Sequence, residues 1–238
     1  MAAAANIDPI QLYLPSESLY IFTDIETDSV QANILLQIAA VTEKGEEFNV
    51  FINPRCPLTQ SCTTFLGFYF FNGGLYRNGR KLPSIFVAQA LENFMKWISK
   101  LKQPVVLVFH NGFSFDCTIL ARFLVQFGTK IPENLITVGD TLPYIRNTLK
   151  APLVENHKLG TLAKYFQIDQ EQAHDALSDS LTLKLICDKL ADQNGTGYQQ
   201  IFKDSFRPFS DYLNKHLLGT PIVPLKKKNK EMKKVTAT

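Results

Sequence analysis

The feature that most limits the possible folds is a continuous apolar run in the middle of the chain. Residues 104–109 read Pro-Val-Val-Leu-Val-Phe, without a single polar side chain. A short run of this kind is typical of a strand that is buried on both faces of its sheet. His110, Asn111 and Gly112 interrupt the run, and a helical apolar period follows from about residue 116. Because such a strand needs helices on both sides, the run predicts an α/β protein.

The rest of the chain supplies further strands and amphipathic helices. Short connections predict that the first three strands form an antiparallel meander. Ser84 is the expected cap of the helix before the apolar run, and Asp175 is the expected cap of the longest helix after it. Together the elements predict a mixed five-stranded sheet flanked by helices. The expected strands cover 18–24, 33–42, 47–52, 104–109 and 135–139; the expected helices cover 84–100, a segment from about 116, 141–149, 158–166, 176–190 and 198–218.

The chain of 238 residues divides into one folded domain and two terminal segments. The periodic pattern predicts a domain over residues 18–218, preceded by an N-terminal extension over 1–17. Residues 219–238 are expected to form a disordered basic tail. Within the domain, residues 53–83 are rich in proline and glycine, so we expect an irregular, turn-rich connection there.

Charge is distributed unevenly along this sequence. The formal net charge is +3, but six lysines and one glutamate lie in the last fifteen residues, so that the remaining body carries a net charge of −2. A slightly acidic body does not resemble a protein that coats nucleic acid nonspecifically. The lysine tail is interpreted as a nuclear import signal or a sequence-independent clamp for phosphates, the alternative being a solvated chain end.

Several classes of protein are disfavoured by what the sequence lacks. Its longest clean apolar run is far shorter than the roughly 20 residues of a membrane span, and its start shows no basic and apolar pattern of a secretory signal. Four scattered cysteines match neither a disulfide framework nor the spacing of a zinc site. We therefore expect a nuclear or cytoplasmic protein that does not insert into membranes.

Two carboxylates end the first predicted strand. Asp24 and Glu26 are two residues apart, so their side chains share one face of the strand. Two like charges beside apolar neighbours repel each other, and a divalent cation with a preference for oxygen ligands is their natural partner. The alternative is a solvated strand end, which is the commoner meaning of an isolated Asp-x-Glu.

Two further groups of chemically active residues follow later in the chain. Asp116 comes shortly after the buried strand, where it could act as an ordinary helix cap. If the first and the buried strands are parallel neighbours, Asp116 lies at the same sheet edge as the first two carboxylates. His174 precedes the longest helix and Asp179 lies in its first turn, so both can lean toward one point; a surface histidine followed by first-turn acids is the alternative.

These five residues, in this order and spacing, resemble the signature of the DEDDh exonucleases, the DnaQ-like family that includes polymerase proofreading subunits. The segments 22–27, 110–116, 158–162 and 174–179 resemble the three-prime repair exonuclease branch in particular. The resemblance covers about residues 18–190 and implies a ribonuclease H-like α/β fold, which agrees with the predicted order of elements.

The resemblance also implies roles for individual residues. Asp24, Glu26, Asp116 and Asp179 are expected to hold two Mg²⁺ ions, for which Mn²⁺ can substitute, and His174 is expected to act as the general base. Thr27 and Phe115 match positions that contact the 3′-terminal nucleotide, although the Phe115 ring could equally belong to the core. The chain departs from the family at Asp28, where many members carry glycine. The resemblance therefore does not determine the local shape of the pocket for the 3′ end. His110 and His157 are interpreted as structural.

The function expected from this resemblance is a metal-dependent 3′→5′ exonuclease that acts on single-stranded DNA. The expected partner is that nucleic acid, with a homodimer as a further possibility and no membrane. A first alternative is an enzyme of the same fold that degrades RNA or short oligonucleotides, because no residue plainly accepts or rejects a 2′-hydroxyl. A second is a noncatalytic binding or scaffolding module, which has no need of all five residues.

Overall fold

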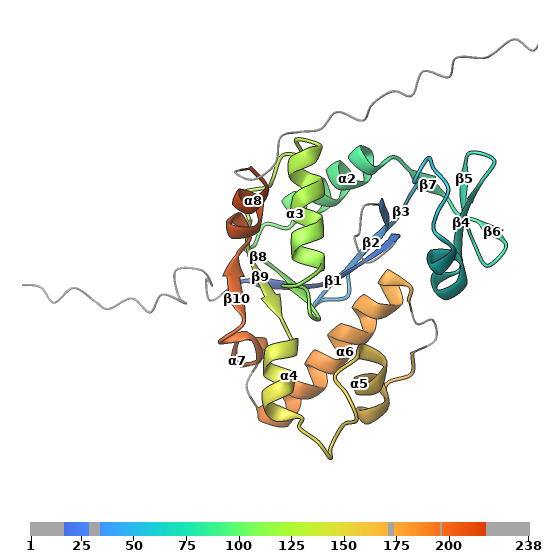
Figure 1. Cartoon of the computed structure of the whole chain (residues 1–238). Helices are drawn as coiled ribbons and strands as arrows, with labels where there is room; N and C mark the ends of the chain where they lie inside the picture. The colour runs from blue at the N-terminus through green and yellow to red at the C-terminus, as the bar shows by residue number, and fades with distance from the viewer. Residues whose placement is uncertain (1–16, 29–33, 171–173, 196, 218–238) are drawn as a thin grey trace, which may run out of the picture.

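A mixed sheet crosses the centre of the computed structural model of this protein, which describes residues 17–28, 34–170, 174–195 and 197–217; within them the sheet has seven strands (Figure 1). Its central strand β1 (Leu19–Asp28) is parallel to β8 (Val105–Phe109) and antiparallel to β2 (Ile34–Thr42). The order across the sheet is β10-β9-β8-β1-β2-β3-β7. The other strands are β3 (Glu47–Ile52), β7 (Ser84–Ile85), β9 (Leu135–Asp140) and β10 (Phe206–Pro208).

The predicted α/β fold is confirmed, and two short edge strands, β7 and β10, extend the five that we expected. Ser84 does not cap a helix. It forms the two-residue strand β7 with Ile85, which pairs with β3, and the helix begins only at Val87. The single helix expected over 198–218 is also wrong. Pro208 cannot continue a helix from the preceding turn, and Phe206–Pro208 pairs with β9 and separates two short helices.

Alternation along the buried strand explains the three layers of the molecule. Val106 and Val108 of β8 belong to the core on one face of the sheet, and Leu107 and Phe109 belong to the core on the other. Figure 1 shows one group of helices on each face. The first group is α2 (Val87–Lys100), α3 (Asp116–Gln126) and α8 (Phe209–Leu217); the second is α4 (Leu142–Thr148), α5 (Leu159–Tyr165), α6 (Ala176–Asn194) and α7 (Tyr198–Phe202).

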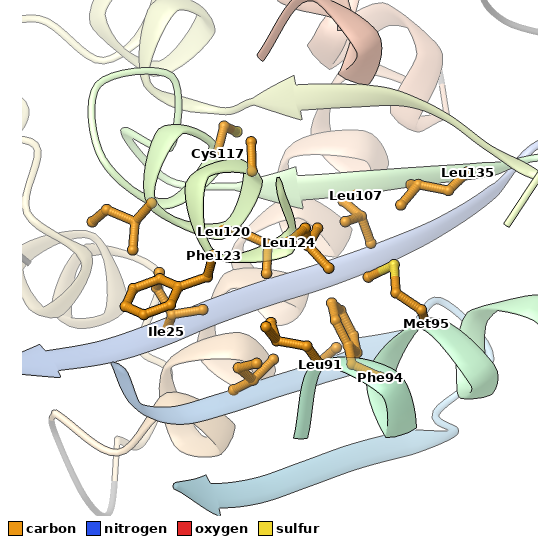
Figure 2. Packing of buried hydrophobic residues seen from close by; sticks show 14 of the residues in the cluster. Ile25, Leu91, Phe94, Met95, Leu107, Cys117, Leu120, Phe123, Leu124 and Leu135 are labelled. Atoms are coloured by element: carbon orange, nitrogen blue, oxygen red, sulfur yellow. The ribbon is translucent and has the colours of Figure 1, made fainter. Parts of the chain in front are cut away.

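The core under α2 and α3 fixes the position of the central strand. Figure 2 shows Leu91 and Phe94 of α2 and Leu120 and Leu124 of α3 directed toward β1 and β8. These side chains are almost completely buried, and each buried side chain of this size stabilises the fold by roughly 2 kcal/mol. None of the helices in the described part of the chain is both long and apolar enough to cross a bilayer.

Residues 53–83 do not form the irregular connection that we expected. They contain a short π-helical turn, η1 (Cys62–Leu66), and a separate antiparallel sheet of β4 (Phe68–Phe71), β5 (Gly74–Arg77) and β6 (Arg80–Lys81). We call this small sheet the hairpin sheet. Its side chains Phe68 and Leu75 pack with Leu36 of β2, which anchors it beside the main sheet. Asn78 and Gly79 both have positive φ angles, 48° and 83°, as a tight hairpin turn requires.

The predicted tail over 219–238 and most of the predicted N-terminal extension over 1–17 lie outside the described residues. The domain boundaries at 18 and 218 therefore stay predictions.

Candidate active site

The carboxyl ends of β1 and β8 meet at one edge of the sheet, which is where the structure brings the predicted residues together. Phe22 of β1 pairs with Val108 of β8 in parallel register, so both strands end close to each other. Tyr20 and Phe22 point into the core beneath α6. Because side chains alternate along a strand, Asp24 and Glu26 continue this row on the face that α6 covers. A register shift against β2 follows directly after Glu26 and reshapes the end of the strand.

The loop after β8 carries Asp116 to the same edge. Gly112 is required in it, because a Cβ atom there would lie 2.2 Å from the Cβ of Phe109. The buried carboxylate of Asp140, at the end of β9, holds the loop by accepting hydrogen bonds from the backbone N–H groups of Asn111 at 2.9 Å and Phe113 at 3.0 Å. Helix α3 then starts at Asp116 itself, with Phe115 and not Asp116 at the cap position.

His174 and Asp179 approach from the start of α6. The carboxylate of Asp175 caps this helix, as predicted, and accepts hydrogen bonds from the N–H groups of Leu177 at 3.1 Å and Ser178 at 3.2 Å. His174 has a φ of 64°, a left-handed conformation that is rare outside glycine. One ligand atom each of Glu26, His174 and Asp179 lies within 4.8 Å of the others. The predicted convergence of these side chains is therefore present in the structure.

Burial and mutual repulsion raise the pKa values of the four carboxyl groups. Desolvation, followed by repulsion from Asp116, raises the pKa of Asp24 well above its ordinary value. Burial and the charge of Asp179 raise the pKa of Glu26 to about 8, although the positive charge of Arg77 acts in the opposite direction. Burial raises the pKa of Asp116 to about 7, and it also raises that of Asp179, although the Gln170 amide donates a hydrogen bond to Asp179 at 2.6 Å. The site thus concentrates acidic groups that lack sufficient positive charge within the protein.

This donor set suits a hard divalent cation. Four carboxyl groups from three separate segments offer oxygen atoms, which Mg²⁺ and Mn²⁺ prefer, and a cation bound among them would relieve the repulsion that raises their pKa values. A ring nitrogen of His174 lies within 4.8 Å of a carboxylate oxygen of Glu26 and of Asp179, and an imidazole is a group that can accept or donate a proton near neutral pH. The arrangement can therefore bind metal and activate water.

The two predicted substrate-binding residues adjoin two of these carboxylates in the sequence. Thr27 follows Glu26 on β1 and its side chain is half-buried. The Phe115 ring is 47% exposed, which excludes the alternative in which it belongs to the core. Asp28, the departure from the family pattern, is buried and accepts hydrogen bonds from the backbone N–H of Thr59, at 2.9 Å, and from its hydroxyl. It therefore ties the segment before η1 to the end of β1.

His110 and His157 make internal hydrogen bonds. His110 Nδ1 lies 2.7 Å from the hydroxyl of Thr141, and its Nε2 lies 2.7 Å from the carbonyl oxygen of His157. His157 Nε2 lies 2.8 Å from the carbonyl oxygen of Leu149. These contacts agree with the structural roles that we expected for both rings.

Asp140 shapes the loop before Asp116, and we did not predict this role from the sequence. Its carboxylate also accepts a hydrogen bond from the N–H of Leu142 at 2.9 Å, which starts α4. The available signal was an aspartate directly after the strand predicted over 135–139, which the structure places as the last residue of β9. That signal does not reveal contacts with a loop almost 30 residues earlier in the chain.

Comparisons with known proteins agree with this geometry. A family model for exonucleases, RNase_T, matches residues 21–186. The chain is 34% identical over 171 residues to the PolC-type DNA polymerase III of Streptococcus sanguinis and 33% identical over 185 residues to that of Streptococcus pyogenes. These alignments cover 69% and 75% of this chain but only 10% and 11% of the polymerases.

Solved exonuclease I structures share the fold. Escherichia coli exonuclease I in complex with a dA16 oligonucleotide superposes with a TM-score of 0.59 at 16% identity, over 84% of this chain and 44% of that one. Exonuclease I of Methylocaldum szegediense gives a TM-score of 0.61 at 15% identity, over 78% and 43%. None of these comparisons supports the homodimer that we considered. The family model spans most of the main sheet and all five residues of the predicted signature, so the chain belongs to the RNase_T exonuclease family, as a DnaQ-like member.

Proposed function

We propose that this protein is a divalent-metal-dependent 3′→5′ exonuclease that removes nucleotides from the 3′ end of single-stranded DNA. The observation that carries the proposal is the convergence of Glu26, His174 and Asp179, whose ligand atoms lie within 4.8 Å of one another, beside the partly buried carboxyl groups of Asp24 and Asp116. The family membership supports nuclease activity. Because the chain spans about a tenth of its polymerase relatives, the reaction and its substrate are proposals for this chain.

In this proposal the carboxylates of Asp24, Glu26, Asp116 and Asp179 would hold two Mg²⁺ or Mn²⁺ ions, which would supply positive charge for the scissile phosphate and lower the pKa of water. His174 accepts a proton from the attacking water while the water oxygen bonds to phosphorus and the bond from phosphorus to the 3′-oxygen breaks. The leaving 3′-oxygen takes a proton from solvent, so that the products are a nucleoside 5′-monophosphate and a chain with a new 3′-hydroxyl. His174 is exposed, so it can pass the proton on to solvent.

Two residues are proposed to bind the 3′-terminal nucleotide. Phe115 directly precedes Asp116 and is about half exposed, and among the described residues it takes part in no aromatic ring pair. Its ring is therefore free to stack on a base or a sugar. Thr27 follows Glu26 on β1, and its backbone is proposed to contact the 3′-terminal nucleotide. DNA is the favoured substrate because the polymerases named above act on DNA and the E. coli structure contains an oligodeoxynucleotide.

The test is a digestion of 5′-labelled single-stranded DNA, duplex DNA and RNA of the same sequence with Mg²⁺, with products resolved by length. We expect a ladder that shortens from the 3′ end, fastest on single-stranded DNA. Asp24→Asn is the matched control, because it keeps the shape of the side chain and removes a metal-binding charge. Faster digestion of RNA would favour the exoribonuclease alternative. Binding without digestion of any substrate would favour the noncatalytic module.

A further inference from the structure

Arg77 connects the hairpin sheet to the segment that carries His174. Its Nη2 donates a hydrogen bond to the carbonyl oxygen of His174 at 2.7 Å, and its Nη1 forms an ion pair with Asp175 at 2.7 Å. Its Nε donates to the carbonyl oxygen of Leu66, the last residue of η1, at 3.2 Å. The guanidinium lies 4.9 Å from the centre of the Phe68 ring, so three acceptors and an aromatic ring fix it in place.

These contacts act on the part of the backbone that is hardest to hold. The left-handed conformation of His174 is unfavourable for a residue with a Cβ atom, and it persists only where the surroundings fix it. Arg77 binds the carbonyl group that follows the His174 side chain and also the carboxylate of the next residue. A rotation of that peptide would swing the imidazole away from Glu26 and Asp179.

The start of α6 is held in place by further contacts that do not involve Arg77. Asp175 caps the helix through the N–H groups of Leu177 and Ser178, and Gln37 of β2 both donates to Asp175 at 3.3 Å and accepts from the N–H of Ala176 at 3.3 Å. Loss of Arg77 therefore leaves the start of the helix attached to the main sheet. Its effect is expected at His174, which precedes these contacts.

We propose that Arg77 is a positioning residue, which uses the hairpin sheet to hold His174 in the orientation required for proton transfer. This inference rests on the proposed function of His174 as general base. It assigns a purpose to residues 53–83: Asp28 fixes Thr59 at the end of β1, η1 follows, and Arg77 binds both the end of η1 and the His174 backbone. A continuous set of contacts thus joins the strand that carries Asp24 and Glu26 to the loop that carries the base.

The test compares Arg77→Ala and Arg77→Lys with Arg80→Ala on single-stranded DNA. Arg80 is the matched control, because it is exposed, belongs to the same small sheet and pairs with Arg77 across its strands. We expect Arg77→Ala to lower kcat by about 10- to 100-fold with KM nearly unchanged, since misplacement of a catalytic group mainly affects the chemical step. Arg77→Lys keeps the charge but cannot bind three acceptors in one plane, so it should restore only part of the rate. Arg80→Ala should behave as wild type.

A double mutant separates positioning from other effects. In a His174→Ala background, Arg77→Ala should lower kcat by less than about twofold, because the group that Arg77 positions is already absent. A full loss in that background would overturn the proposal, as would a rise in KM alone, full rescue by lysine or an equal loss in Arg80→Ala. Normal kcat in Arg77→Ala would do the same.

Amide hydrogen exchange tests the contact without relying on catalysis. Arg77→Ala should accelerate exchange in the peptide that begins at His174 and leave β1 and β8 unchanged. Unchanged exchange at His174 would overturn the proposal at the level of structure. If exchange accelerates but the wild-type protein digests no nucleic acid, the contact exists and the proposed function is what fails. Melting temperatures of all variants show which of them are folded.

Discussion

Metal-free stability should fall as pH rises, and Glu26 should cause much of that fall. Burial and the charge of Asp179 raise its pKa from 4.5 to about 8 in the folded protein. Between these two values the folded state retains a proton that the unfolded chain has lost. The contribution of this retained proton to the free energy of unfolding is therefore fully present below pH 4.5 and is lost as pH rises through 8.

The size of the effect follows from the width of this interval. From pH 5 to pH 8 the folded and unfolded states differ by close to one proton at Glu26, which corresponds to a loss on the order of 4 kcal/mol. Glu26→Gln keeps the shape of the side chain and removes the titration. It also removes a charge that repels Asp24, so the variant should lose clearly less stability over the same range.

The assay is urea-induced unfolding in a chelator at pH 5, 6, 7 and 8. We expect the wild type and Glu26→Gln to have similar free energies of unfolding at pH 5 and the variant to be more stable by a few kcal/mol at pH 8. Glu92→Gln on the exposed side of α2 is the control and should follow the wild type. An identical pH dependence in wild type and Glu26→Gln would refute the claim that this buried charge opposes folding.

Four further predictions concern metal, base, tail and loop. Millimolar Mg²⁺ should raise the melting temperature of the wild type more than that of Asp24→Asn, measured by thermal unfolding, and turnover should cease in a chelator. His174→Ala should lower single-turnover rates by about 10²–10⁴-fold with metal affinity retained, whereas a larger loss in His110→Ala would identify a different base. Deleting residues 225–238 removes six lysines and one glutamate, so affinity for long single strands should fall and depend less on salt in binding titrations, with little change in cleavage of short ones. Asp140→Asn should destabilise the protein by about 2–4 kcal/mol in urea unfolding, because its carboxylate binds three backbone N–H groups.

Much of the site was predictable because its residues occupy positions that local sequence defines. The separation of Asp24 and Glu26 by one residue places both on one face of a strand, whatever surrounds it. The apolar run that forms β8 identifies a buried neighbour, and the loop after it carries Asp116. Asp175 is a helix cap recognisable from its neighbours, so it locates His174 before α6 and Asp179 within it.

The wrong predictions about the fold have a common cause, which is the pairing of a short strand with a distant segment. Ser84 looks like a helix cap, but it pairs with Phe51 of β3 and therefore belongs to the sheet. The apolar period over 198–218 suggests one helix, but Phe206 pairs with Gly139 of β9. The proline and glycine residues of 53–83 predict turns correctly, yet the strands between those turns are short and give little periodic signal.

By itself the sequence determined the α/β order of elements and the buried strand β8, because strand alternation, helix capping and apolar runs act over a few neighbouring residues. It also contains five residues whose order and spacing resemble the signature of the DEDDh exonucleases. Only the tertiary structure decided that Arg77 contacts His174, 97 residues later, that Asp140 holds the Asn111 loop and that Asp28 binds Thr59. Each of these contacts joins a charged side chain to backbone or polar groups of a remote segment. Such a partner is chosen by the packing of the whole sheet and its helices, which no local pattern of residues encodes.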